Sequence, residues 1–173
     1  MSNPPESFDD FFRREIRSLV TFVLKLGYDA EDARDAAAQA MTMAYQHWER
    51  LTNPLAWVRV AAQRIALRHA RRKRAGTACA IQLWSESREV AAAPSELIEG
   101  NHRVLALLDI LPSQQREVMV WHMDGFETDE IARHLGVSEA TVRSTKRHAR
   151  NLLKKKLEDL TRRPGEEGPG YGS

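Results

Sequence analysis

Apolar residues return every three or four positions along most of this chain, which is the period of an amphipathic helix. The first such stretch covers residues 8–26 and is followed by Gly27, a residue type that commonly ends helices. Its apolar positions are Phe8, Phe12, Ile16, Leu19, Val23 and Leu26. Asp29 is then placed to cap a second helix over residues 30–48. The apolar face of that helix carries Ala33, Ala37, Ala40, Met41, Ala44 and Trp48, and these mostly small residues predict a closely packed neighbour.

A third long helix is expected after a loop that ends at Pro54. It begins at Leu55 or Ala56 and continues to Arg74, at the end of a run of four basic residues. Periodicity then weakens over residues 75–101, which include two Gly, three Ser and one Pro, so we expect a linker there. No segment alternates apolar and polar residues in the manner of a strand.

These elements predict an all-α protein made of two small helical domains joined by a flexible linker. The first domain is expected over residues 1–74, and residues 75–101 form the linker. A helix over residues 102–109 leads into the second domain, which extends over residues 102–160. The tail over residues 161–173 has too few apolar residues to fold and is expected to be disordered.

The most informative local pattern lies within residues 111–157 and predicts a helix-turn-helix. Thr128 is the expected N-cap of the first of its two helices, and Gly136 supplies the left-handed residue that ends it. Val137 is expected to fill the space between the helices, and Ser138 to cap the second one. The expected core positions of the motif are Ile131, Ala132, Leu135, Val142 and Ala149.

The outer face of the second helix carries basic and hydroxyl side chains, which suit base edges and phosphates in a DNA major groove. Since residues three or four apart share a helical face, the candidate DNA contacts are Arg143, Ser144, Arg147 and His148. Lys146 is expected to extend along the domain surface toward a phosphate. Residues 154–156, all lysine, are expected to form only a solvated helix end.

The small net charge of +2 conceals a strong partition of charge along the chain. The first 35 residues hold eight acidic and five basic residues, whereas residues 50–85 hold eight basic residues and no acidic one. Segregated basic surface is typical of a protein that binds nucleic acid. No apolar run approaches the roughly 20 residues that span a bilayer, and the start of the chain lacks the basic and apolar segments of a signal peptide, so a cytoplasmic location is expected.

The sequence offers little that would support catalysis, and we expect no enzymatic activity, cofactor or metal. The six histidines show no HExxH or other metal-ligand spacing, and no Gly-rich phosphate loop or serine nucleophile motif occurs. One cysteine, Cys79, excludes an intramolecular disulfide and a cysteine-based zinc site. A structural or exposed thiol is a simpler interpretation of Cys79 than a redox-sensing thiol.

The motifs together resemble the bacterial sigma factors of the extracytoplasmic-function type (group IV). The C-terminal resemblance is carried by Leu111-Pro112, Gln115-Arg116, Gly125, Glu130-Ile131-Ala132 and Thr141-Val142-Arg143-Ser144. The N-terminal resemblance is carried by Phe8, Phe12, Ala33-Arg34-Asp35, Tyr45, Trp48, Pro54, Ala56-Trp57-Val58 and Arg71-Arg72. The resemblance implies a subunit of RNA polymerase that directs promoter-specific initiation.

In that family the C-terminal unit, region four, recognises the minus thirty-five promoter element, and the N-terminal unit, region two, binds polymerase and opens the minus ten element. The resemblance implies contacts to the minus ten element by Arg64, Arg68, Arg71 and Trp57, and contacts to core polymerase by Asp35 and Gln39. The three arginines lie at four- and three-residue steps, which suits a strand backbone. Trp57 can stack on an unpaired base, but a place in the core is the favoured alternative, as for Trp48 and Trp121.

Several positions depart from the family pattern. Arg34 stands where the family usually has an acidic residue, and Ala38 and Gln39 stand where it has a Gln-Glu pair. Arg64 and Arg68 occupy positions where the family often has Asn or Asp, which favours phosphate contacts over base recognition. The resemblance also implies an anti-sigma partner. The alternative function is an autonomous helix-turn-helix regulator, which would bind palindromic DNA without polymerase.

Overall fold

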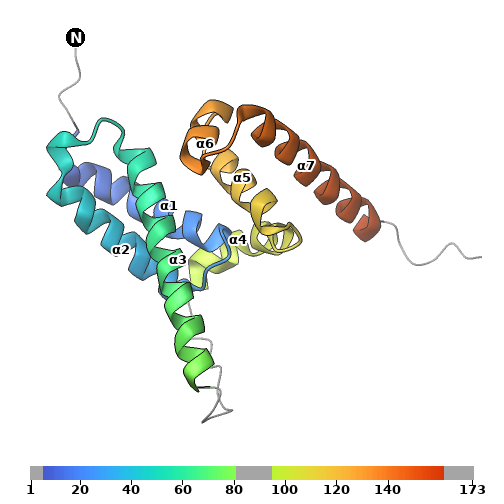
Figure 1. Cartoon of the computed structure of the whole chain (residues 1–173), viewed down its shortest axis with the longest axis horizontal. Coiled ribbons are helices and arrows are strands. Elements are labelled where there is room, and N and C mark those ends of the chain that lie inside the picture. The colour runs from blue at the N-terminus through green and yellow to red at the C-terminus, as the bar shows by residue number, and fades with distance from the viewer. Residues whose placement is uncertain (1–5, 81–94, 162–173) are drawn as a thin grey trace, which may run out of the picture. The chain divides into compact units, whose positions relative to one another are not determined.

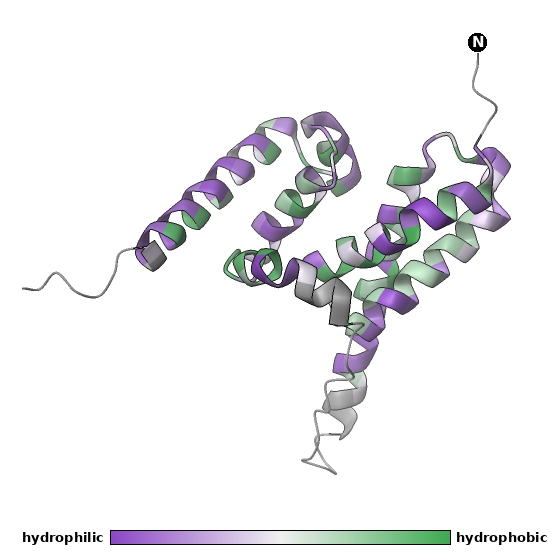
Figure 2. Ribbon diagram, turned by 180° about the vertical axis from the view of Figure 1, so that it is seen from behind, coloured by the Kyte–Doolittle hydropathy of each residue, from purple (hydrophilic) through white to green (hydrophobic). Residues whose placement is uncertain are grey.

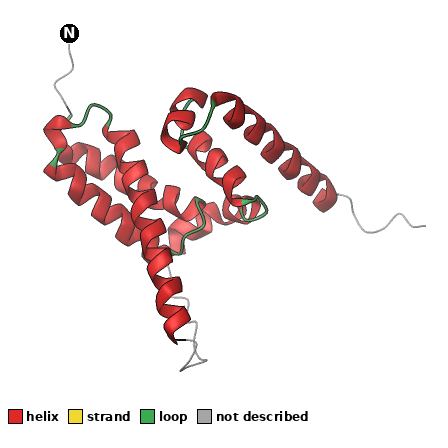
Figure 3. Cartoon of the chain, in the orientation of Figure 1, coloured by secondary structure: helices red, strands yellow, loops and turns green. Residues whose placement is uncertain are grey.

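The computed structural model describes residues 6–80 and 95–161, and in these ranges it contains helices and no strands (Figures 1 and 3). The elements are α1 (Phe8–Lys25), α2 (Ala30–Gln46), the short 3-10 helix η1 (Trp48–Arg50), α3 (Pro54–Ala80), α4 (Ser95–Leu108), α5 (Ser113–Met123), α6 (Thr128–Leu135) and α7 (Glu139–Thr161). The all-α prediction is therefore confirmed.

Contacts between the helices divide the chain into two compact units, Met1–Leu108 and Asp109–Ser173. In the first unit α2 packs against α1 and α3, and α4 also contacts α1. In the second unit α5, α6 and α7 pack on one another. The segment predicted as a linker is helical up to Ala80 and again from Ser95, and its residues 81–94, like the predicted tail from residue 162 onward, lie outside the described part of the chain. None of the helices in the described residues combines the length and the hydropathy of a membrane span.

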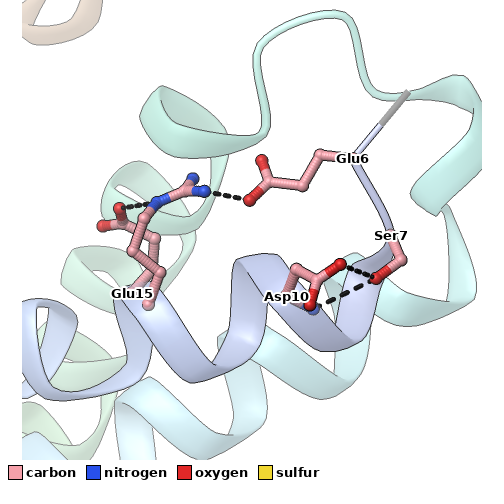
Figure 4. Close-up of polar contacts among 5 residues, drawn as sticks. Glu6, Ser7, Asp10 and Glu15 are labelled. Atoms are coloured by element: carbon pink, nitrogen blue, oxygen red, sulfur yellow. Dashed lines mark hydrogen bonds and ion pairs between the residues drawn. The ribbon is translucent and has the colours of Figure 1, made fainter. Parts of the chain in front are cut away.

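Local side-chain contacts fix the start of α1. The backbone N–H of Asp10 donates to Oγ of Ser7 at 3.2 Å, and the Ser7 hydroxyl donates to Oδ2 of Asp10 at 2.7 Å (Figure 4). Glu6 and Glu15 both bind the guanidinium of Arg14 on the same stretch (Figure 4). The helix ends just before Gly27, whose φ of 102° favours glycine.

The core of the first unit is built around the small face of α2. The predicted alanines are fully buried and Met41 is 1% exposed, so α1 and α3 approach α2 closely. On α1, however, the apolar pattern placed the wrong phenylalanine inward. Phe11 is 2% exposed and packs on Trp48 with ring centroids 5.0 Å apart, whereas Phe12 is 38% exposed. Trp48 is half-buried and belongs to η1 instead of α2, because α2 ends at Gln46.

The second unit is a helix-turn-helix supported by α5. Its core includes Val142 and Ala149 of α7 and Ile131 of α6, each fully buried, and Trp121 of α5, which is 1% exposed. The ring of Trp121 packs on that of Phe126 with centroids 4.8 Å apart. The prediction that Trp121 is a core residue is therefore confirmed.

The turn of this motif confirms two predicted end signals. Gly136 has a φ of 68° and ends α6, and Oγ of Ser138 accepts from the backbone N–H of Thr141 at 3.1 Å at the start of α7.

Two other expectations for the turn were wrong. The N-cap of α6 is Glu127, whose N–H donates to the carboxylate of Glu130 at 2.9 Å, and Thr128 is the first helical residue. Val137, which directly follows the αL residue Gly136, is 41% exposed and does not fill the space between the helices.

Candidate nucleic-acid interface

The first candidate surface lies along α7, whose ribbon is mostly hydrophilic with apolar patches recurring at intervals (Figure 2). Burial of Val142 and Ala149 fixes which side of the helix faces the core. Arg143, Arg147 and His148 are exposed, and Ser144 is half-buried. The predicted contact residues therefore lie on the part of α7 that is accessible to a partner.

Two of these residues have contacts within the helix. Nη1 of Arg143 lies 2.8 Å from Oε2 of Glu139, and both side chains are exposed. The Ser144 hydroxyl donates to the carbonyl oxygen of Thr141 at 3.0 Å. Because an exposed ion pair contributes little stability, Arg143 can exchange Glu139 for a base or a phosphate at small cost.

A second basic group lies where α7 meets α5. Lys146 is half-buried, and its Nζ lies 3.4 Å from Nδ1 of His122, while Nη2 of Arg150 lies 3.1 Å from Nε2 of the same ring. The expected extension of Lys146 along the surface thus leads to His122. Lys154, Lys155 and Lys156 are exposed, and Lys154 Nζ lies 3.9 Å from Oε1 of Glu158.

The second candidate surface is formed by α3. Arg64, Arg68 and Arg71 are all exposed, at the four- and three-residue steps that place them on one stripe of the helix. Trp57, one turn into the helix, is half-buried, so part of the residue is accessible. The structure thus brings the three arginines together on α3.

The candidate polymerase contacts, Asp35 and Gln39, are exposed and lie one turn apart on α2. Arg34 and Ala38, two of the positions that depart from the family pattern, line a groove between α1 and α2. The other walls of the groove are largely apolar: Phe8, Phe12, Ile16, Val20, Met41, Thr42 and Tyr45. The groove beside the two candidate contacts therefore combines one arginine with mostly apolar side chains.

Two charged contacts in the first unit were not anticipated from the sequence. Arg59 is 2% exposed, and its Nη2 lies 3.0 Å from Oε2 of Glu15 and 2.9 Å from Oγ of Ser18. The sequence did indicate that Arg59 is buried. It lies three residues before Ala62 and seven before Ala66, which are both buried, and therefore on the inward stripe of α3.

The other unanticipated contact involves Asp32, which is 6% exposed. Nζ of Lys73 lies 2.9 Å from Oδ2 of Asp32 and 3.0 Å from Oδ2 of Asp29, the predicted cap of α2. Nδ1 of His69 lies 3.8 Å from Oδ1 of Asp32. The cap itself is confirmed, since Asp29 accepts from the N–H of Asp32 at 2.8 Å.

No group of histidine, cysteine, aspartate and glutamate side chains in the described residues has an arrangement that could hold a metal ion. The side chain of Cys79 lies outside the described part of the chain. The basic and aromatic side chains on α3 and α7 are suited to binding a polyanion by charge and stacking.

Comparisons with known proteins agree with this arrangement. The family model described as "Sigma-70, region 4" matches residues 101–153. Two RNA polymerase sigma-E factors are 28% identical over 164 residues, from Streptomyces avermitilis, and 27% identical over 163 residues, from Streptomyces coelicolor. Each match covers 87% of this chain and 85% of the relative.

Two solved structures have the same fold. The sigma factor RpoE of Bartonella quintana, in complex with the anti-sigma factor NepR, matches with a TM-score of 0.67 and 18% identity over 87% of this chain and 96% of RpoE. CnrH in complex with the cytosolic domain of CnrY matches with a TM-score of 0.60 and 22% identity over 88% of each chain.

The fold and the basic face of α7 define an all-α protein with a C-terminal helix-turn-helix. Within that class, the region 4 match and the sigma-E relatives confirm the resemblance to the extracytoplasmic-function sigma factors that the sequence motifs indicated.

Proposed function

We propose that this protein is a sigma factor that binds core RNA polymerase and directs promoter-specific initiation. The observation that carries the proposal is the match of residues 101–153 to sigma-70 region 4 on a helix-turn-helix with an exposed basic helix. In this role α7 lies in the major groove of the minus thirty-five element. Arg143 and Arg147 then contact bases, and Ser144 and His148 complete the contact face.

The first unit engages polymerase and the minus ten element. Arg64, Arg68 and Arg71 form an exposed stripe on α3 that follows the backbone of a separated strand. Trp57, half-buried at the start of the same helix, offers the exposed part of its ring to an unpaired base. With arginines where the family often has Asn or Asp, this helix depends more on phosphate contacts than on base recognition.

Asp35 and Gln39 on α2 contact core polymerase. They are exposed one turn apart beside the groove lined by Arg34 and Ala38. Since Arg34 reverses the charge and Ala38 is apolar where the family pattern has Gln, we expect this interface to use less negative charge and more apolar contact than that pattern. The proposed domain limits remain residues 1–74 and 102–160, and the proposed location is the cytoplasm.

The protein carries out no chemical reaction of its own, in keeping with a subunit that confers specificity on an enzyme. An anti-sigma partner is also proposed, because RpoE and CnrH, which share the fold, were each solved with a bound partner protein. The partner holds the protein away from polymerase until a signal releases it. Co-purification of a stoichiometric protein from the source cell, and loss of promoter activity when that protein is added, test this part.

Footprinting with and without core polymerase separates this function from that of an autonomous helix-turn-helix regulator. A sigma factor protects two elements upstream of a start site only when core enzyme is present. An autonomous regulator protects a palindrome without core enzyme, with half-sites one helical turn apart. Protection of such a palindrome by the protein alone, unchanged by core enzyme, would overturn the proposal.

A further inference from the structure

Three hydrogen-bond donors converge at the junction of α5 and α7 in the second unit. Lys146 approaches Nδ1 of His122 at 3.4 Å, and Arg150 approaches Nε2 at 3.1 Å. A neutral imidazole has one acceptor nitrogen and one N–H, so it can accept from only one of these two cations. Whichever tautomer forms, the other cation faces an N–H group. The cluster therefore contains more donors than acceptors.

The described structure shows no carboxylate bonded to Lys146 or Arg150, and their polar contacts are those with His122. An unmatched group of donors at a partly exposed position is suited to an oxyanion, which supplies several acceptor atoms at once. A phosphate group has the charge and the number of oxygens to accept from all three side chains.

The position of the cluster indicates the source of that phosphate. Arg150 lies seven residues after Arg143 and three after Arg147, so the three arginines share one side of α7. Seven residues correspond to about 10 Å along a helix, a distance that one duplex spans easily. From Arg143 to Arg150 the helix carries four Lys and Arg residues and no Asp or Glu, as expected for a surface that meets a polyanion.

We propose that His122, Lys146 and Arg150 form a phosphate-binding cluster that holds one phosphodiester of duplex DNA beside the base-contacting face of α7. Lys146 and Arg150 supply charge-assisted hydrogen bonds, and His122 adds a further donor when protonated. This inference rests on the proposed DNA-binding role of α7. It adds a residue of α5, His122, to the contact face predicted from α7 alone.

The surroundings of His122 predict that phosphate binding is coupled to proton uptake. Burial lowers the pKa of His122, and the charges of Lys146 and Arg150 lower it further, while Glu127 and a hydrogen bond with the backbone of Phe126 raise it. A phosphate between the two cations offsets their charge and favours the imidazolium ring. Binding therefore raises the pKa of His122, and affinity for DNA increases as pH falls through that range.

Nuclear magnetic resonance of the full-length protein tests the cluster directly. The imidazole signal of His122, assigned with a His122→Gln variant, is titrated with acid for the free protein, with inorganic phosphate, and with a short duplex at low salt. Non-specific duplex binding by such basic surfaces has a Kd on the order of 10⁻⁴ to 10⁻⁶ M at physiological salt, which this method detects. We expect the duplex to raise the pKa of His122 more than inorganic phosphate at equal phosphate concentration.

A matched pair of double variants provides the second measurement. Lys146→Ala with Arg150→Ala is expected to reduce the slope of log affinity against log salt by about one, the loss of one phosphate contact. Lys155→Ala with Lys156→Ala removes the same charge from exposed positions outside the cluster and is expected to leave the slope nearly unchanged. Circular dichroism establishes that both double variants are folded.

Each contrary outcome overturns a defined part of the proposal. If the duplex binds but leaves the pKa of His122 unchanged, and both double variants lose equal affinity, the cluster holds no phosphate while the DNA-binding role of α7 stands. If inorganic phosphate raises the pKa of His122 and the duplex does not, the site takes a free anion and not a DNA phosphodiester. If the wild-type protein binds no DNA even with core polymerase, the proposed function fails and the DNA source of the phosphate fails with it.

Discussion

Nζ of Lys73 lies 2.9 Å from Oδ2 of the buried Asp32, so a lysine within the basic run of α3 is bound to the acidic start of α2. The carboxylates of Asp32 and Asp29 raise the pKa of Lys73 above its usual range. The stabilising effect is therefore fully present below the unfolded pKa of about 10.4 and is lost only as pH rises through the raised value. The four basic residues that end the predicted helix are thus not one functional patch.

Substitution of Lys73 and Arg71 is predicted to have different effects. Lys73→Ala lowers the free energy of unfolding by roughly 1 kcal/mol, a small value because the side chain is half exposed. Arg71→Ala changes that free energy by less than about 0.5 kcal/mol, because Arg71 is exposed, but weakens binding of single-stranded DNA. Urea denaturation and strand-binding titrations measure the two effects. If the two variants were equally stable and lost the same affinity for single-stranded DNA, Lys73 and Arg71 would not have the different roles assigned to them.

The buried Arg59 is predicted to stabilise the first unit through its contacts with Glu15 and Ser18. Arg59→Ala leaves Glu15 without this partner and lowers the free energy of unfolding by about 3 kcal/mol. Arg64→Ala, which alters an exposed arginine five residues later on the same helix, changes it by less than about 0.5 kcal/mol. The denaturant midpoints of the two variants measure this difference in stability. Similar midpoints would show that the Arg59 contacts do not stabilise the first unit.

The stability of the second unit is predicted to fall in mild acid because of His134. Its ring stacks on Trp121 with centroids 5.0 Å apart, and burial, followed by the charge of Arg133, lowers its pKa, against the opposing effect of Glu130. The unfolded chain therefore binds a proton at higher pH than the folded one, and stability declines as pH falls through about 6.5.

The variant His134→Phe keeps an aromatic ring against Trp121 and removes the titrating group. It is expected to match the wild type at about pH 8 and to lose less stability at about pH 5.5. Some dependence on pH remains, because the pKa of His122 is also lowered. Thermal unfolding at the two pH values measures the effect. An unaltered dependence in the variant would rule His134 out as its source.

The ion pair between Arg143 and Glu139 is predicted to affect promoter affinity. Arg143→Ala loses a base or phosphate contact, and a bidentate contact to guanine is worth about 1 to 3 kcal/mol of discrimination. Glu139→Gln removes the pair and one negative charge near DNA, so it strengthens binding by the polymerase holoenzyme. Arg133→Ala is the control, because Arg133 is exposed on α6 and pairs with Asp129 at 3.2 Å. If Glu139→Gln weakened binding, Glu139 would have to contact DNA itself.

Much of the fold was predictable because its signals are local. Asp29, Gly136 and Ser138 end or begin helices through contacts within a few residues of themselves, and each has its predicted role. The alanine face of α2 likewise follows from spacing alone, since residues at three- and four-residue steps must lie on one side of a helix.

The sequence-based predictions failed where two interpretations of the local pattern were equally good, or where a contact joins residues that are far apart in the sequence. Phe11 and Phe12 both suit an apolar stripe, and the contact of Phe11 with Trp48, far along the chain, decides between them. Arg59 was absent from the predicted contacts because Glu15 and Ser18 belong to another helix. The same distinction holds for the candidate interface. The contact residues of α7 could be predicted from their spacing, but the approach of His122 from α5 became evident only from the structure.

Transcription with purified core RNA polymerase on a library of genomic fragments is the decisive assay of sigma-factor function. We expect that adding this protein yields transcripts from discrete start sites that share two upstream elements, and that Arg147→Ala reduces this initiation while Arg133→Ala does not. If no fragment supports promoter-dependent initiation, under conditions in which a known sigma factor directs it with the same core enzyme, the protein is not a sigma factor.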